Sequence, residues 1–227
     1  MFAKQFKSEF FRNLLTLMTG TAIAQAIPVL ISPILSRLYT PEEFGVLALF
    51  MSAAAVLGVI STARYELAIM LPDSKRDAMN VLMLSMGIAL LVSLATLIIV
   101  LLFQQPILKF FNTPELEGWL FLVPGMVLLM GIYQSFNYWS TRNKTFKRNS
   151  ASRISQSVSM SAVNLSFGFA NAGSVGLIVG SFTGQAVAAF VLAWSVITHP
   201  KKWKNAFSSK LIRKNAEKYS NFPRINT

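Results

Sequence analysis

Two charged residues lie within an apolar stretch of the chain, and they are its strongest candidates for a functional site. Arg64 and Glu66 follow the apolar run 53–60 and precede the apolar residues 67–71. A charge in the middle of a bilayer costs roughly 2.5–3.5 kcal/mol on insertion scales, so such residues are kept where they have a partner, water or a task. On a continuous helix, residues two apart point about 200° away from each other, so these two side chains would not pair.

Two interpretations of Arg64 and Glu66 stay open. In the first, both side chains lie near the cytoplasmic end of their helix and reach the lipid headgroups along their flexible stems. In the second, they line a cavity that faces the cytoplasm, where the guanidinium binds an anionic substrate with two parallel hydrogen bonds. Glu66 would then tune that site or bind a coupling ion, H⁺ or Na⁺.

Uncharged polar residues in other apolar stretches are candidates for the same cavity. Gln25 precedes Pro28 by one helical turn, and Pro28 and Pro33 each remove a backbone hydrogen bond from the first stretch. Gln156 and Asn164 lie in the fifth and most polar stretch, and their amides need a partner or water. We therefore predict substrate-binding roles for Arg64, Glu66, Gln25, Gln156 and Asn164.

The composition excludes several kinds of catalytic site. The chain has no cysteine and a single histidine, His199, so disulfides, thiolate metal sites, histidine clusters and Ser–His pairs are not available. The sequence also contains no phosphate-binding glycine loop, no metal-ligand spacing and no pair of acids. We therefore expect no enzymatic activity, no metal and no cofactor.

Six apolar stretches dominate the sequence, each long enough to cross a hydrocarbon core of about 30 Å. They predict an all-α polytopic membrane protein with six transmembrane helices. The expected spans are about 13–38, 44–71, 79–103, 119–139, 154–170 and 175–198. Between the first two spans, Thr40 and Glu43 have the spacing of a helix capping box. In the last span, small residues recur every four positions at Gly176, Gly180 and Gly184, which predicts close packing against another helix.

The basic residues predict the orientation of these spans. Of the 21 lysines and arginines, 18 fall in the termini and alternate connecting segments, whereas only Arg37 and Lys109 fall on the opposite side. Since cytoplasmic loops carry the excess of Lys and Arg, both termini are expected in the cytoplasm. The net charge of +12 is then attributed to contact with anionic lipid and not with nucleic acid.

Short amphipathic segments flank the spans at both ends of the chain. The predicted segments are residues 1–12 and the basic segment 199–227. Residues at i, i+4 spacing are Phe2, Phe6 and Phe10 in the first and Trp203, Phe207 and Leu211 in the second. This spacing among lysines predicts helices that lie in the membrane interface. For residues 1–12, a disordered leader is the alternative.

Three stretches resemble the polysaccharide flippases, the O-antigen (Wzx-type) translocases of the multidrug/oligosaccharidyl-lipid/polysaccharide exporter superfamily. They are 36–45 (SRLYTPEEFG), 64–72 (RYELAIMLP) and 142–147 (RNKTFK), and the glycine-containing run 176–185 is similar too. Each motif is moderately specific by itself, whereas their order and spacing together are more specific.

The resemblance implies two six-helix lobes around a central cavity. It implies translocation of undecaprenyl-pyrophosphate-linked oligosaccharide from the cytoplasmic to the periplasmic leaflet of the bacterial inner membrane, for O-antigen or capsule synthesis. By this resemblance, Arg64 and Glu66 are the residues expected to act in the central cavity. Since six spans are half of such a protein, we expect a truncated or split gene, or assembly with a second lobe or a second copy.

Two other functions stay open from the sequence. The first is a non-transporting membrane scaffold that docks glycan-assembly enzymes through its basic segments, in which case residues 201–218 matter and Arg64 does not. The second is a drug or ion exporter of the same superfamily. A site built around Arg64 should reject cations, so transport of cationic dyes would distinguish this exporter from a flippase.

Overall fold

The computed structural model describes residues 2–111, 118–198 and 209–219, and these residues form helices and turns without a β-strand. Six helices have 20 or more residues. They are α1 Phe2–Leu38, α2 Pro41–Ile60, α4 Lys75–Phe111, α5 Leu122–Arg142, α6 Phe146–Phe169 and α7 Ser174–Ile197. Two shorter helices are α3 Tyr65–Ala68 and α9 Ser209–Lys218.

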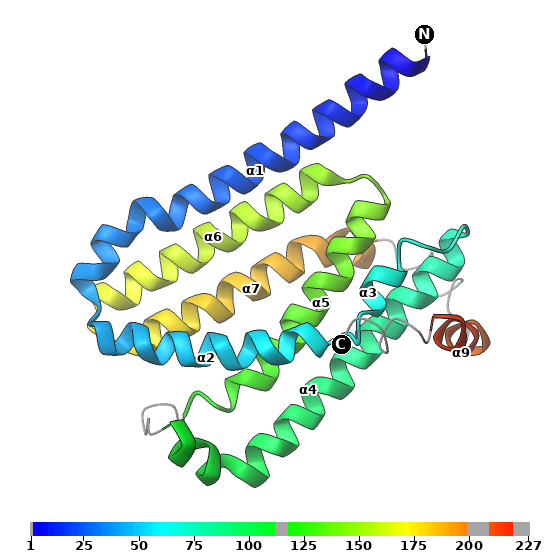
Figure 1. The fold of residues 1–227 in the computed structure, drawn as a ribbon. Helices are drawn as coiled ribbons and strands as arrows, with labels where there is room; N and C mark the ends of the chain where they lie inside the picture. The colour runs from blue at the N-terminus through cyan, green and yellow to red at the C-terminus, as the bar shows by residue number, and fades with distance from the viewer. Residues whose placement is uncertain (1, 112–117, 199–208, 220–227) are drawn as a thin grey trace.

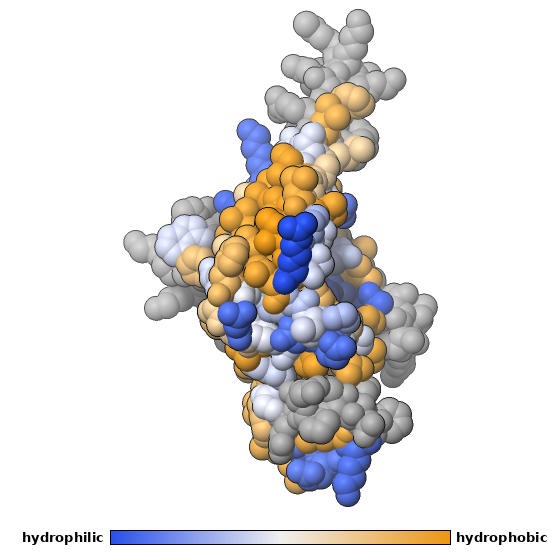
Figure 2. All heavy atoms as spheres, turned by 90° about the vertical axis from the view of Figure 1, so that its left-hand side faces the viewer, coloured by the Kyte–Doolittle hydropathy of each residue, from blue (hydrophilic) through white to orange (hydrophobic). Residues whose placement is uncertain are grey.

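Four helical segments in the described part of the chain are both long enough and apolar enough to cross a membrane. They are Leu15–Leu38, Pro41–Ile60, Lys75–Lys109 and Ser174–Trp194. Large apolar side chains point outward from them, and Leu30 of α1 and Leu102 of α4 are more than 70% exposed. Broad apolar areas are also visible on the side of the molecule where α1 ends and α2 begins (Figure 2). Such a surface suits lipid and not water, so the chain is a polytopic all-α membrane protein.

The helices pack as neighbours in the order α1, α6, α7, α5 and α4, and α2 packs against both α5 and α7 (Figure 1). The α1–α2 and α6–α7 turns lie at one end of the bundle, on the left of Figure 1. The α3–α4 and α5–α6 turns lie at the opposite end. Lys75 begins α4 and Arg142 ends α5, so these two basic residues lie at that second end.

The first helix is a single element, whereas the sequence predicted an interfacial helix over 1–12 and a span from residue 13. No proline or glycine stands near that boundary to interrupt it. The helix also continues through both of its prolines. Pro33 leaves the Val29 carbonyl without an amide donor, and the Ser32 hydroxyl donates to that oxygen instead (2.8 Å). The side chains of Phe2, Phe6, Phe10, Trp203 and Phe207 lie outside the described part.

The predicted helix over 44–71 is instead two helices, α2 and α3, joined by the turn 61–64. Ala63 (φ 46°) and Arg64 (φ 61°) are both left-handed, which costs roughly 1–2 kcal/mol for each non-glycine residue. Residues 61–64 contain no glycine or proline, so the sequence contained no local signal for a break in the helix. Hydroxyls stabilise the turn: Ser61 donates to the Gly58 carbonyl (2.7 Å), and Thr62 donates to the Glu66 carboxylate.

Two further helix boundaries differ from the prediction. α4 continues to Phe111, past the expected end at residue 103, with a kink at Phe103 (φ −117°, ψ 19°) just before Pro106. α6 begins at Phe146, well before the expected start at residue 154. The extra turns of α6 are held by tertiary contacts, since the Ser152 hydroxyl donates to the Ala188 carbonyl of α7 (2.8 Å).

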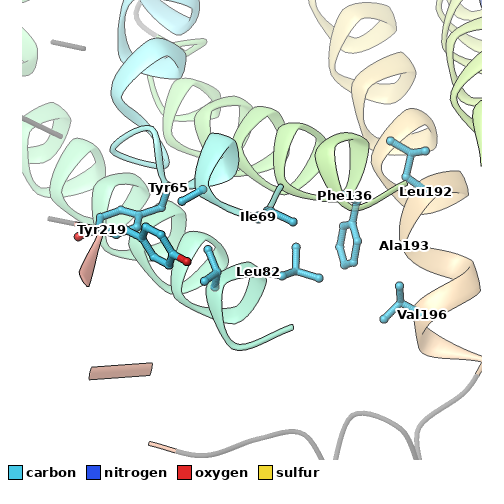
Figure 3. Packing of buried hydrophobic residues seen from close by; sticks show 10 residues of the cluster. Tyr65, Ile69, Leu82, Phe136, Leu192, Ala193, Val196 and Tyr219 are labelled. Atoms are coloured by element: carbon cyan, nitrogen blue, oxygen red, sulfur yellow. The ribbon is translucent and has the colours of Figure 1, made fainter. Parts of the chain in front are cut away.

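An apolar cluster surrounds the short helix α3 and fixes it to its neighbours. Tyr65 and Ile69 meet Leu82 of α4 and Phe136 of α5, and Tyr219, which follows α9, joins the same cluster (Figure 3). The Tyr65 hydroxyl also donates to the Ala216 carbonyl of α9 (3.1 Å). The helix α9 thus packs against α4, and its predicted location in the membrane interface stays a prediction.

The turn between α1 and α2 contains the predicted capping box. The Glu43 amide donates to the Thr40 hydroxyl (3.3 Å), and the Thr40 amide donates to the Glu43 carboxylate (2.8 Å). Beside it, Tyr39 is buried and donates from its hydroxyl to the Asn164 carbonyl of α6 (2.6 Å). Burial, together with the negative charge of Glu43, raises the pKa of Tyr39, so its hydroxyl keeps the proton that it donates.

Loss of the cap is expected to weaken the fold by a modest, measurable amount. We expect Thr40→Ala to lower the free energy of unfolding by about 1 kcal/mol, because one amide of the first turn of α2 loses its acceptor. Thermal unfolding of the purified protein in detergent measures this change. Thr40→Ser keeps the hydroxyl and should unfold near the wild-type temperature; equal losses in both variants would contradict the capping role.

Candidate functional site

A hollow of about 490 Å³ lies between α1 and α6. Its wall on α1 consists of Thr21, Ala24, Gln25, Pro28 and Val29, and its wall on α6 consists of Arg153, Gln156 and Ser157. Because Pro28 has no amide hydrogen, the Ala24 carbonyl lacks its usual helical donor. The hollow therefore combines a guanidinium, two side-chain amides, two hydroxyls and a carbonyl without its helical partner.

Arg153 is the cationic residue in this lining. Its guanidinium lies near enough to the Tyr133 hydroxyl of α5 to act on it electrostatically. Its Nε is shielded from solvent and has no hydrogen-bond partner among the described residues. A guanidinium presents five donors in a fixed fork that matches phosphate and carboxylate. One hydroxyl does not occupy five donors, so Arg153 keeps other N–H groups that could bind an anion in the hollow.

Sequence reasoning missed Arg153 as a site residue, because it was assigned to the basic segment before the fifth span. The structure places it inside α6, where it shares the hollow with Gln156. One signal was available: residues three apart lie on the same helix face, and Arg153 precedes Gln156 by three.

Two of the predicted site residues, Gln25 and Gln156, come together in the hollow from different helices. Gln25 is exposed on α1. Gln156 is half-buried, and its Nε2 donates to Gln185 Oε1 of α7 (2.8 Å). This bond fixes the direction of the Gln156 amide, so its remaining groups keep a defined orientation beside Arg153.

Asn164 lies elsewhere, buried between α6 and α7. With its amide oriented to satisfy its surroundings, its nitrogen donates to the carbonyls of Met160 (3.1 Å) and Gly176 (3.2 Å). A Cβ added at Gly180 would come within 1.8 Å of the Asn164 side-chain amide, and one at Gly184 within 2.9 Å of the Gln156 backbone carbonyl. The glycine stripe of α7 therefore faces α6 at close range, and Asn164 joins the two helices there.

Arg64 and Glu66 occupy a third location, the break between α2 and α3. The Arg64 side chain is half-buried, and its Nε is shielded without a hydrogen-bond partner among the described residues. Glu66 is only 1% exposed and accepts a hydrogen bond from Thr62. Neither residue lines the hollow between α1 and α6. Since Glu66 lies inside the bundle, it does not extend to the headgroups as one of the two interpretations required.

The end of α3 is held by an arginine from α5. Arg142 Nη1 donates to the carbonyls of Ile69 (3.1 Å) and Met70 (2.9 Å), and Nη2 donates to that of Pro72. We call these contacts the Arg142 clamp. It joins two stretches, 64–72 and 142–147, that lie far apart in the sequence.

A family profile described as polysaccharide biosynthesis protein matches residues 34–215. The chain belongs to this family. No curated protein and no solved structure matched the chain. In this polysaccharide biosynthesis protein, the matched range contains the broken helix, the Arg142 clamp and the α6 wall of the hollow. The match confirms the family resemblance indicated by the sequence motifs.

Proposed function

We propose that this polysaccharide biosynthesis protein is one six-span lobe of a transporter for lipid-linked oligosaccharide. Its cargo is an oligosaccharide on undecaprenyl pyrophosphate, which moves from the cytoplasmic to the periplasmic leaflet of the bacterial inner membrane. The observation that carries this proposal is the Arg153 guanidinium, which lines a hollow between two helices of a membrane protein together with the amides of Gln25 and Gln156.

The hollow offers complementary chemistry to such a headgroup. A pyrophosphate carries negative charge and oxygens that a guanidinium binds bidentately. Sugar hydroxyls both donate and accept, as do the amides of Gln25 and Gln156, while the Ala24 carbonyl accepts. The volume of about 490 Å³ lies within the 300–1,000 Å³ that is typical of small-molecule sites. The proposal needs binding and movement without a bond-making step, so the protein acts without a cofactor.

The gathering of basic turns at one end of the bundle supports an orientation with that end in the cytoplasm. A second lobe, from another chain or another copy, would then provide the opposite wall of the transport path. A scaffold that recruits glycan-assembly enzymes is the competing function, and it would depend on residues 201–218 and not on the hollow.

Complementation of a flippase-deficient strain tests the proposal. The chain is expressed alone and with a second lobe, and surface glycan is measured at matched levels of membrane-inserted protein. Arg153→Gln is expected to reduce surface glycan at least about tenfold, which corresponds to the loss of roughly 1.4 kcal/mol of interaction. Arg148→Gln, in the same helix but outside the hollow, is the matched control and should retain transport.

Two results would contradict this function. Full surface glycan with Arg153→Gln would remove the hollow from the mechanism. Loss of glycan only after deletion of residues 201–218, with both arginine variants active, would favour the scaffold. The parallel variant Arg64→Ala reports whether the half-buried guanidinium at the helix break also contributes to transport.

A further inference from the structure

Hydrogen bonds join α1 and α6 on both sides of the hollow, along a seam where the two helices run side by side (Figure 1). On the side of the α5–α6 turn, the Ser150 hydroxyl donates to the Thr16 carbonyl (2.8 Å). On the side of the α1–α2 turn, the Tyr39 hydroxyl donates to the Asn164 carbonyl (2.6 Å). We call the first the inner contact and the second the outer contact. A polar molecule that moves along the seam must pass one of them to reach the hollow.

The inner contact brings the backbones of the two helices close together. A Cβ added at Gly20 would overlap the Ser150 side chain and lie 3.1 Å from the Ser150 Cα. Gly20 is buried, and Ser150 is 6% exposed. Glycine is unfavourable in a helix interior, but it permits another backbone to approach closely. The inner contact therefore leaves no room for water between Gly20 and Ser150.

The inner contact is also thin. Thr21, which follows Gly20 directly, already lines the hollow, as does Arg153, three residues after Ser150. Three residues correspond to about 4.5 Å along a helix axis. On its other side, α6 itself begins only one turn earlier, at Phe146. A single layer of residues thus separates the hollow from the end of the bundle where α6 begins.

The outer contact is much deeper. Leu35 and Tyr39 form an apolar cluster with Leu177 of α7, and Phe44 and Leu47 of α2 pack against this cluster. The outer half of α1 is therefore fixed to α2, α6 and α7 at once. Opening the seam at this end would require several layers of apolar contacts to separate.

The inner half of α1 has fewer attachments. Among the described helices, α1 packs chiefly against α6. Leu15, Met18 and Ile23 of the inner half point outward and are each about half exposed. When the Ser150–Thr16 hydrogen bond breaks, the inner half can leave α6 with little other loss of packing. Of the two contacts, the inner one is therefore the easier to open.

We propose that the inner contact is the gate through which a polar headgroup enters the hollow. The gate is closed in this structure. It opens when the Ser150–Thr16 hydrogen bond breaks and the inner half of α1 moves away from α6, while the outer contact stays in place. The identity of the headgroup rests on the proposed function, whereas the gate itself is defined by the access of water to the hollow.

Single cysteines measure this access, because the chain has no cysteine of its own. Ser157→Cys places a thiol in the hollow, and membrane vesicles of either orientation are treated with a charged thiol reagent. Such a reagent does not cross lipid, so it reaches residue 157 only through water. Ser150→Ala removes the gate's hydrogen bond and should speed labelling about fivefold. Gly20→Ala forces the helices apart and should speed it about tenfold or more.

Three further variants are controls. Lys147→Cys, exposed in the first turn of α6, should react rapidly in every background, and it identifies the vesicle orientation that presents the inner end. Gly87→Ala, whose added Cβ meets nothing within 4 Å, should leave the labelling of Ser157→Cys unchanged. Tyr39→Phe removes the outer hydrogen bond and should not speed labelling from the inner end.

Each alternative outcome has a definite meaning. Equal labelling of Ser157→Cys with and without Ser150→Ala and Gly20→Ala would overturn the gate, as would acceleration only from the outer end. If Gly20→Ala does not fold, Ser150→Ala, which removes a single oxygen, decides the question. Labelling needs no cargo, so a working gate in a chain that does not transport would count against the proposed function and not against the gate.

Discussion

Replacing Arg142 with alanine is expected to lower the free energy of unfolding by roughly 3 kcal/mol. The change removes three charge-assisted hydrogen bonds from the carbonyls of Ile69, Met70 and Pro72. Hydrogen bonds to charged groups contribute roughly 1.5–3 kcal/mol each, and water recovers part of the loss at this half-buried position. The end of α3 would then lose its attachment to α5, so the loss should appear as a lower midpoint of thermal unfolding in detergent.

Two substitutions distinguish the hydrogen-bond geometry of the Arg142 clamp from the effect of its positive charge alone. Arg142→Lys keeps the positive charge but offers a point-like ammonium, which does not match three carbonyls at once, so most of the loss should persist. Lys147→Ala removes an exposed charge from the first turn of α6 and should change the midpoint little. If Arg142→Lys were as stable as the wild type, the geometry of the clamp would not be the source of its stability.

The second large effect concerns Gly176 of the glycine stripe, and the opposite sign is expected at Gly87, a glycine outside the stripe. Gly176→Ala would place a Cβ 2.5 Å from the Phe167 Cβ of α6 and 2.3 Å from the Tyr39 hydroxyl. Because the Phe167 Cβ is attached directly to the backbone, α6 and α7 must move apart. Overpacking of this kind costs about 1–3 kcal/mol, and it would also disturb the bond between Tyr39 and Asn164.

Gly87→Ala is the matched control on α4. A Cβ at Gly87 meets nothing within 4 Å, so alanine should stabilise the helix by about 0.5–1 kcal/mol through its higher propensity. Thermal unfolding of the two single variants under identical conditions measures both signs. A stabilising Gly176→Ala would show that α7 does not depend on close approach to α6.

The family-like stretches have structural roles that the sequence revealed only in part. Thr40 and Glu43 of the first stretch cap α2, and Tyr39 of the same stretch anchors α6. The second and third stretches meet in the Arg142 clamp. The cap joins residues three apart and could be predicted, whereas the Tyr39 anchor and the Arg142 clamp join positions that are 70 or more residues apart.

Properties set by composition and local spacing followed from the sequence. Long apolar runs identified a polytopic helical membrane protein, because a bilayer accepts few other backbone structures. The capping box depends on residues three apart, and the glycine stripe depends on the helical period, so both were predictable. The family followed from the order of short motifs and is confirmed over residues 34–215.

Only the tertiary structure decided where the functional groups meet. The break at 61–64 is held by hydroxyls and by an apolar cluster from several helices, and no local breaker announces it. Arg153 became a site residue when α1 was placed against α6, and Asn164 became a packing residue when α7 was placed against that same helix. Helical periodicity defines the faces of a single helix, but the choice of neighbour comes from the packing of all the helices together.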